Sequence, residues 1–207
     1  MRGGDVPFIR KPPIGDVPML RVLLSIVLIF LAACAATPDR RMASEAEPAS
    51  IDDVCAVAQC GYDIRVELKQ EDGSLFAETF DAMPIVQEAG VSVYAGSTVL
   101  FEADVVKGEL VNLRLVAEVV NPERTIRVKL EQDDKGNMML ITNNPFDKYL
   151  KIRMGIMPLA LDQLVRTSSC PVVARGASFE MWPYPIFQVF LGDMRLMSES
   201  ETMACTE

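Results

Sequence analysis

Apolar and polar residues alternate along most of the chain beyond residue 63, and clusters of turn-forming residues interrupt the alternation at near-regular intervals. In the first such stretch Ile64, Val66 and Leu68 alternate with charged residues. A period of two residues is typical of a strand with one buried and one solvated face. The pattern predicts eight or nine short strands, in the segments 63–69, 75–80, 91–94, 99–105, 113–119, 126–131, 138–142, 150–156 and 186–197.

Strands with one wet face bury the other by packing sheet against sheet, so the pattern favours an all-β sandwich or open barrel. The segment 141–152, ITNNPFDKYLKI, resembles the strand, Asn-rich turn and strand of immunoglobulin-like bacterial envelope domains. We therefore predict one small immunoglobulin-like β-sandwich over residues 51–207. Only Leu159–Val165 is expected to form a helical turn or two. The strand at Val91–Tyr94 and the Trp182 loop are the expected open edges.

The amino-terminal segment has a different pattern. Arg21 precedes an apolar run over residues 22–33 that ends in small residues. At ~1.5 Å per residue this run is too short to cross the ~30 Å hydrocarbon core of a bilayer. Its charge and length are typical of a secretory signal peptide, which we place at residues 1–33. The residues before Met19 are either a long amino-terminal region or lie upstream of the true start.

The end of this run, Leu31-Ala32-Ala33-Cys34, resembles the lipobox of bacterial lipoproteins. The resemblance implies diacylglycerol on Cys34, cleavage before it and, because alanines follow, a place on the periplasmic side of the outer membrane. An uncleaved signal anchor or an ordinary secretory signal is the alternative. Residues 34–50 have no apolar periodicity and are predicted to be a disordered tether. The whole chain is similar to uncharacterised lipoproteins of Gram-negative bacteria, a resemblance that carries no activity.

Four cysteines remain once Cys34 is set aside, and an even number in an exported chain predicts two disulfides. Four cysteines allow three pairings, of which we favour Cys55–Cys60 and Cys170–Cys205. A zinc site built from all four thiolates is the alternative, but the paired C-x2-C spacing of such sites is missing.

Charge and composition exclude several function classes. Removing residues 1–33 takes four of the 20 basic and two of the 29 acidic residues, which leaves 16 against 27 and a net charge of -11. A surface this acidic repels phosphate backbones, so we expect no nucleic-acid partner. The chain has no histidine, which excludes Ser–His and Cys–His catalysis and every metal site that needs an imidazole. We expect no cofactor and no metal.

Few residues stand out as candidates for chemistry or binding. Glu102 and Asp104 share the polar face of one strand, which we expect to be solvated. Trp182, the only tryptophan, and Tyr184 lie among prolines. They are either rigid anchors for a partner protein or, for Trp182, a plug at one end of the sandwich.

These observations predict a non-enzymatic envelope lipoprotein. Its sandwich is structural or binds a protein, which we expect to be another envelope protein, and the lipid holds it to the membrane. The alternative is a small-ligand carrier or an enzyme whose carboxylate, lysine or tyrosine site assembles only in the folded chain. A deep pocket with such side chains would favour that alternative, whereas a filled interior would favour the binding module.

Overall fold

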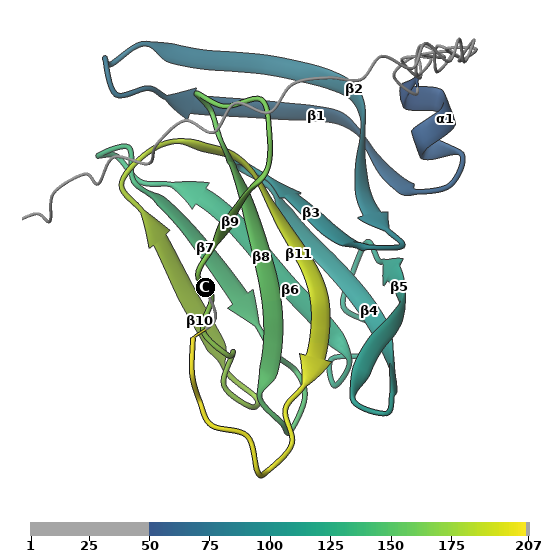
Figure 1. The fold of residues 1–207 in the computed structure, drawn as a ribbon. Helices are drawn as coiled ribbons and strands as arrows, with labels where there is room; N and C mark the ends of the chain where they lie inside the picture. Colours follow the sequence, from purple (N-terminus) through teal and green to yellow (C-terminus); the bar gives the residue numbers. More distant parts are fainter. Residues whose placement is uncertain (1–49, 206–207) are drawn as a thin grey trace, which may run out of the picture. The chain divides into compact units, whose positions relative to one another are not determined.

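Antiparallel pairing joins all the strands that the structure describes. The computed structural model describes residues 50–205, so the predicted signal peptide, Cys34 and most of the tether lie outside the described residues. The elements, in chain order, are α1 (Ile51–Cys55), β1 (Gln59–Lys69), β2 (Leu75–Gln87), β3 (Gly90–Tyr94), β4 (Thr98–Val106), β5 (Glu109–Leu115), β6 (Thr125–Gln132), β7 (Met138–Asn143), β8 (Leu150–Pro158), β9 (Val165–Thr167), β10 (Ala177–Trp182) and β11 (Ile186–Leu196) (Figure 1).

The eleven strands form two layers of a sandwich. Hydrogen bonding connects β1-β2-β3-β11-β8-β9 on one side and β5-β4-β6-β7-β10 on the other. In Figure 1, β8 and β11 lie in front of β6 and β7. The all-β sandwich predicted from the sequence is confirmed. Within residues 50–205 no helix is long and apolar enough to cross a membrane.

β11 connects the two layers. Its first half pairs with β3, from Gln188↔Tyr94 to Gly192↔Gly90. A register shift then falls between Gly192 and Arg195, where Asp193 has a left-handed backbone (φ 43°), and Arg195 pairs with Glu109 of β5. A bulge of this kind bends a strand, and here it passes β11 from one layer to the other.

The core consists of the inward faces of both layers. Members with no more than 5% exposure include Val66, Leu68, Val91, Val93, Val99, Phe101, Ile126, Val128, Leu130, Met138, Leu140, Leu150, Ile152, Met154, Ile156, Val189 and Leu191. The neighbouring strands β3 and β11 approach closely at Gly90, where a Cβ atom would lie 2.1 Å from the carbonyl oxygen of Leu191. Only glycine fits at this position.

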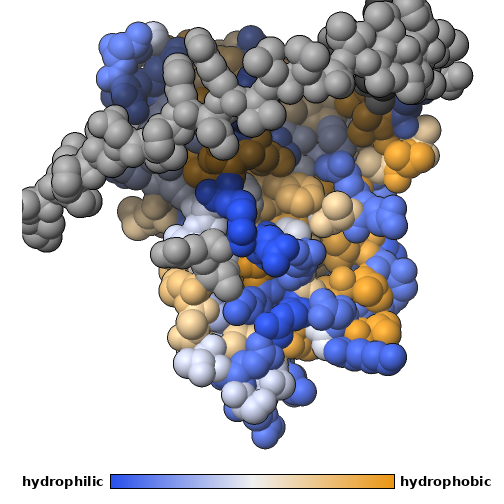
Figure 2. Space-filling model, viewed as in Figure 1, coloured by the Kyte–Doolittle hydropathy of each residue, from blue (hydrophilic) through white to orange (hydrophobic). Residues whose placement is uncertain are grey.

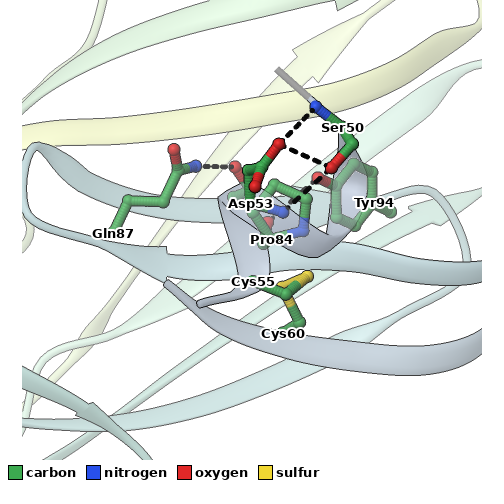
Figure 3. Close-up of a disulfide and its surroundings, with 8 residues drawn as sticks. Ser50, Asp53, Cys55, Cys60, Pro84, Gln87 and Tyr94 are labelled. Atoms are coloured by element: carbon green, nitrogen blue, oxygen red, sulfur yellow. Dashed lines mark hydrogen bonds between the residues drawn. A yellow bond between two sulfur atoms is a disulfide. The ribbon is translucent and has the colours of Figure 1, made fainter. Parts of the chain in front are cut away.

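A short helix and two disulfides fix the ends of the sandwich. Ser50 caps α1, and its hydroxyl and the Asp53 carboxylate form a reciprocal capping box (Figure 3). Cys55 is bonded to Cys60 at the start of β1. The other disulfide joins Cys170 to Cys205. The favoured pairing is thus confirmed, and because the four sulfurs are bonded in pairs they do not form the alternative tetrathiolate zinc site.

Two local predictions need correction, and the strands β9 and β10 were not predicted. Residues 159–165 contain a turn and the start of β9 rather than a helical turn. β3 is not an open edge, since it pairs with β2 and β11 and all five of its residues are buried. The strand β10 was not predicted at all, although it forms an open edge of the sheet. β3 was misplaced because strand order depends on long-range pairing, which a local pattern does not contain.

Candidate functional site

Trp182 ends β10 and faces the interior. Its side chain is only 8% exposed, and its indole Nε1 donates a hydrogen bond to Thr167 Oγ1 on β9 at 3.3 Å. A buried indole usually needs such a partner for its N–H group. This burial fits the structural role that the sequence left open, a plug at the end of the sandwich, because the ring offers little surface to another protein.

Tyr184, two residues further on, lines a surface cleft of about 470 Å³. The end of β8 and the Tyr184 loop supply its apolar wall, through Pro158, Leu159, Ala160 and Pro185, while the β1–β2 turn supplies Gln70, Glu71 and Asp72. The Ser74 hydroxyl and amide donate to the Asp72 carboxylate and lower its pKa. An apolar wall beside two carboxylates can accept an apolar group that carries a positive charge.

The outer face of β10 is apolar and exposed. Phe179 is 63% and Met181 65% exposed, and on the neighbouring strand Ile141 and Met139 lie directly opposite them. Within residues 50–205 β10 pairs only with β7, so its other side is an open edge. Pale orange surface marks this region at the left of Figure 2, where Figure 1 places β10. We call Ala177–Trp182 the β10 edge.

The sequence placed an open edge at the Trp182 loop but did not reveal the strand β10 that ends there, for a physical reason. Its residues do alternate, but the usual assumption that apolar residues face inward places Phe179 and Met181 in the core. The largest side chain, Trp182, is instead buried, and the half-buried Ser178 and Glu180 lie on the same face as Trp182 because residues two apart share a face. Glu180 accepts a hydrogen bond from the backbone N–H of Cys170 at 3.2 Å.

Glu102 and Asp104 form an ion-pair cluster rather than the freely solvated face that the sequence predicted. Glu102 is 6% exposed and accepts a hydrogen bond from Asn121 Nδ2 at 2.8 Å, with Arg114 and Arg124 each 3.8 Å away. Asp104 lies between the same two guanidinium groups, at 3.3 Å from Arg114 and 2.5 Å from Arg124.

The arginines of this cluster lower the pKa of Asp104. Hydrogen bonds from Arg114, Asn112 and Arg124 lower its pKa to about 2. A carboxylate held in its charged form is a poor proton donor or acceptor near neutral pH. The cluster therefore fits a role in joining β4, β5 and the segment before β6 better than a role in acid–base chemistry.

Among residues 50–205, no three Cys, Asp or Glu side chains gather where they could hold a metal ion. A cleft of about 670 Å³ lies at the ends of β6, β7 and β10, where Arg127 and Arg175 line it together with Glu123. Comparison with protein-family models, curated proteins and solved structures finds no match to this chain.

Proposed function

We propose that this chain is a lipoprotein of the bacterial cell envelope whose sandwich binds another protein and performs no catalysis. A diacylglycerol group on Cys34 would hold it on the periplasmic side of the outer membrane. The lipobox-like Leu31–Cys34 segment supports the anchor. Two disulfides support an oxidising compartment, in which structural disulfides persist.

The β10 edge carries the binding part of the proposal. A strand with unpaired backbone groups on one side and exposed Phe179 and Met181 on one face is a ready surface for an extended segment. Aromatic and methionine side chains are also enriched at the centres of protein interfaces. Tyr184 follows two residues after this strand and can extend the contact.

Intact mass spectrometry of the membrane fraction tests the anchor. We expect a mass that corresponds to cleavage before Cys34 plus acyl chains, and a gain of four protons on reduction. The Cys34→Ala chain is expected to lose the acyl mass. A full-length mass without lipid would overturn the anchor.

Photo-crosslinking in the envelope tests binding. A photoreactive amino acid at Phe179 is expected to give a covalent adduct with a protein, and the same amino acid at Leu75 is not. Leu75 is a matched control because it lies on β2 with 65% exposure, close to the 63% of Phe179. Adducts of equal yield at the two positions would contradict a binding role for β10.

A small-ligand carrier is the second candidate function, and the Tyr184 cleft favours it because Glu71 and Asp72 line it beside apolar side chains. The test is a titration with octylammonium, with octyl sulfate as the probe of opposite charge. We expect Tyr184→Ala to weaken octylammonium binding ~10-fold, or ~1.4 kcal/mol. Tyr149→Ala, at a tyrosine 39% exposed and outside the cleft, is the control. Equal binding of the two probes would remove this candidate.

A further inference from the structure

We infer that the β10 edge is a self-association site, where two copies of the chain pair their β10 strands antiparallel about a twofold axis at Phe179. This inference rests on the proposed protein-binding function and names the partner. It follows from four features of the strand: the direction of its free backbone groups, its two ends, its outward side chains and its inward side chains.

The backbone fixes which residues can pair. The N–H of Asn144 donates to the carbonyl of Gly176 at 2.8 Å, one step beyond the pair Asn143↔Ala177. Hydrogen-bonded and non-hydrogen-bonded pairs alternate along an antiparallel ladder. Every second residue from Gly176 onward therefore directs its backbone groups to β7. Ala177, Phe179 and Met181 direct theirs to the open edge.

The ends of the strand select one register. Arg175 has a left-handed backbone (φ 50°), which ends the extended conformation on one side, and Pro183 has no N–H group on the other. The segment between them, 176–182, has Phe179 at its centre. Only a register centred on Phe179 pairs this whole segment with itself. Ala177 then lies opposite Met181 of the second copy, and each of the three outward pairs exchanges two hydrogen bonds.

Outward side chains match in this register. Phe179 lies across the axis from Phe179 of the second copy, and Met181 lies against Ala177. Aromatic pairs directly across two strands stabilise a sheet, and no charged residue of the strand is on this face. The half-buried Ile141 and Met139 of β7 continue the apolar surface on both sides.

Inward side chains match as well. The hydroxyl of Ser178 is buried and has no hydrogen-bond partner within one copy. A buried hydroxyl without a partner is costly. In the register centred on Phe179, Ser178 lies opposite Glu180 of the second copy, whose carboxylate has a second oxygen beyond the one bonded to Cys170. The Ser178 hydroxyl can donate to that oxygen.

The interface is small, so the dimer is expected to depend on the local concentration of the chain. One pair of six-residue strands with a narrow apolar face falls at or below the size of transient interfaces. We expect a weak dimer for the free chain and a more complete one when lipid anchors confine both copies to one membrane, since confinement raises the effective concentration.

Cysteine crosslinking of the full chain in its membrane tests the register. Residues of a hydrogen-bonded antiparallel pair have Cα atoms about 5.5 Å apart, which is within the range of a disulfide. We expect Phe179→Cys to give at least ~10-fold more covalent dimer on a non-reducing gel than the Leu75→Cys control. Equal yields at the two positions would overturn the inference.

A second variant tests the monomer–dimer equilibrium without an added thiol. Phe179→Lys places two like charges across the axis. Sedimentation of the full chain in detergent is expected to show a dissociation constant of the dimer at least ~10-fold higher than that of the original chain. The circular dichroism spectrum should be unchanged, because Phe179 is exposed. Identical sedimentation of the variant and the original chain would overturn the inference.

The photo-crosslinking experiment separates the two proposals. An adduct at Phe179 with twice the mass of the chain supports self-association. An adduct with a different protein overturns the second copy as partner and leaves the protein-binding function standing. Absence of any adduct above the Leu75 control overturns both.

Discussion

β1 and β10 are both edge strands of the sandwich, and their free sides have opposite chemistry. The solvent-facing residues over the second half of β1 are Asp63, Arg65, Glu67 and Lys69, all charged and all exposed. Arg65 and Glu67 form an ion pair, and the backbone at Asp63 is left-handed (φ 52°). The outward face of β10 instead carries alanine, phenylalanine and methionine.

The two edge strands differ in how well they are protected against pairing with another strand. Charged side chains and backbone irregularities are the usual devices that prevent one edge strand from pairing with another. β1 has both devices, whereas β10 has neither on its outward face. A chain that protects β1 and leaves β10 apolar is expected to use β10 for contact, which is why the two proposals above rest on β10.

Each edge also has a disulfide beside it. Cys55–Cys60 spans a sequence separation of 5 at the start of β1. Cys170–Cys205 spans 35 residues, and the N–H of Cys170 donates to Glu180 of β10. The long bridge therefore holds the carboxyl-terminal segment next to the apolar edge, and the short bridge closes a local turn beside the charged one.

The largest effect should come from the inner face of β10. Trp182→Ala removes a buried ring and its hydrogen bond to Thr167, so we expect the free energy of unfolding to fall by about 3–5 kcal/mol. Phe179→Ala, on the outer face of the same strand, should change it by less than about 1 kcal/mol. Urea denaturation measures both. Similar losses for the two variants would contradict the assignment of the inner and outer faces.

The second largest effect should be the difference in stabilisation between the two disulfides. In the chain-entropy model, stabilisation grows with the length of the closed loop, and the two separations correspond to about 4 kcal/mol for Cys170–Cys205 and about 2 kcal/mol for Cys55–Cys60. We therefore expect the double variant Cys170→Ser with Cys205→Ser to melt well below Cys55→Ser with Cys60→Ser. Calorimetry of the two variants decides this, and the reverse order would show that loop length does not dominate here.

Most strand positions follow from local features of the sequence. Alternation placed most strands within a few residues, as in the predicted 186–197 against Ile186–Leu196 for β11. The favoured cysteine pairs also proved right. Strand positions depend on spacing along the chain, which a sequence displays directly, whereas the cysteine spacing left all three pairings possible.

Edges and faces depend on contacts that the sequence does not display. The segment Val91–Tyr94 is short and apolar, and only its pairing with both β2 and β11 shows that it is interior. Burial of Trp182 decides which face of β10 points inward, and it leaves Phe179 and Met181 on the exposed face. Glu102 looks like a surface carboxylate until Arg114, Arg124 and Asn121 converge on it from other segments.

The smallest effect should appear when β1 is made to resemble β10. Arg65→Val combined with Glu67→Val removes an exposed ion pair and should leave the free energy of unfolding within ~0.5 kcal/mol of the original, since such pairs contribute little. It also replaces two protecting charges with apolar β-formers, so sedimentation should detect new self-association through β1. That association should be weaker than the one through β10, because Asp63 and Lys69 remain and the left-handed backbone at Asp63 still interrupts a straight edge. Combining the double variant with Phe179→Lys isolates the β1 contribution. A monomer in that background would show that the charges of β1 are not what protects it, and that backbone shape alone is sufficient.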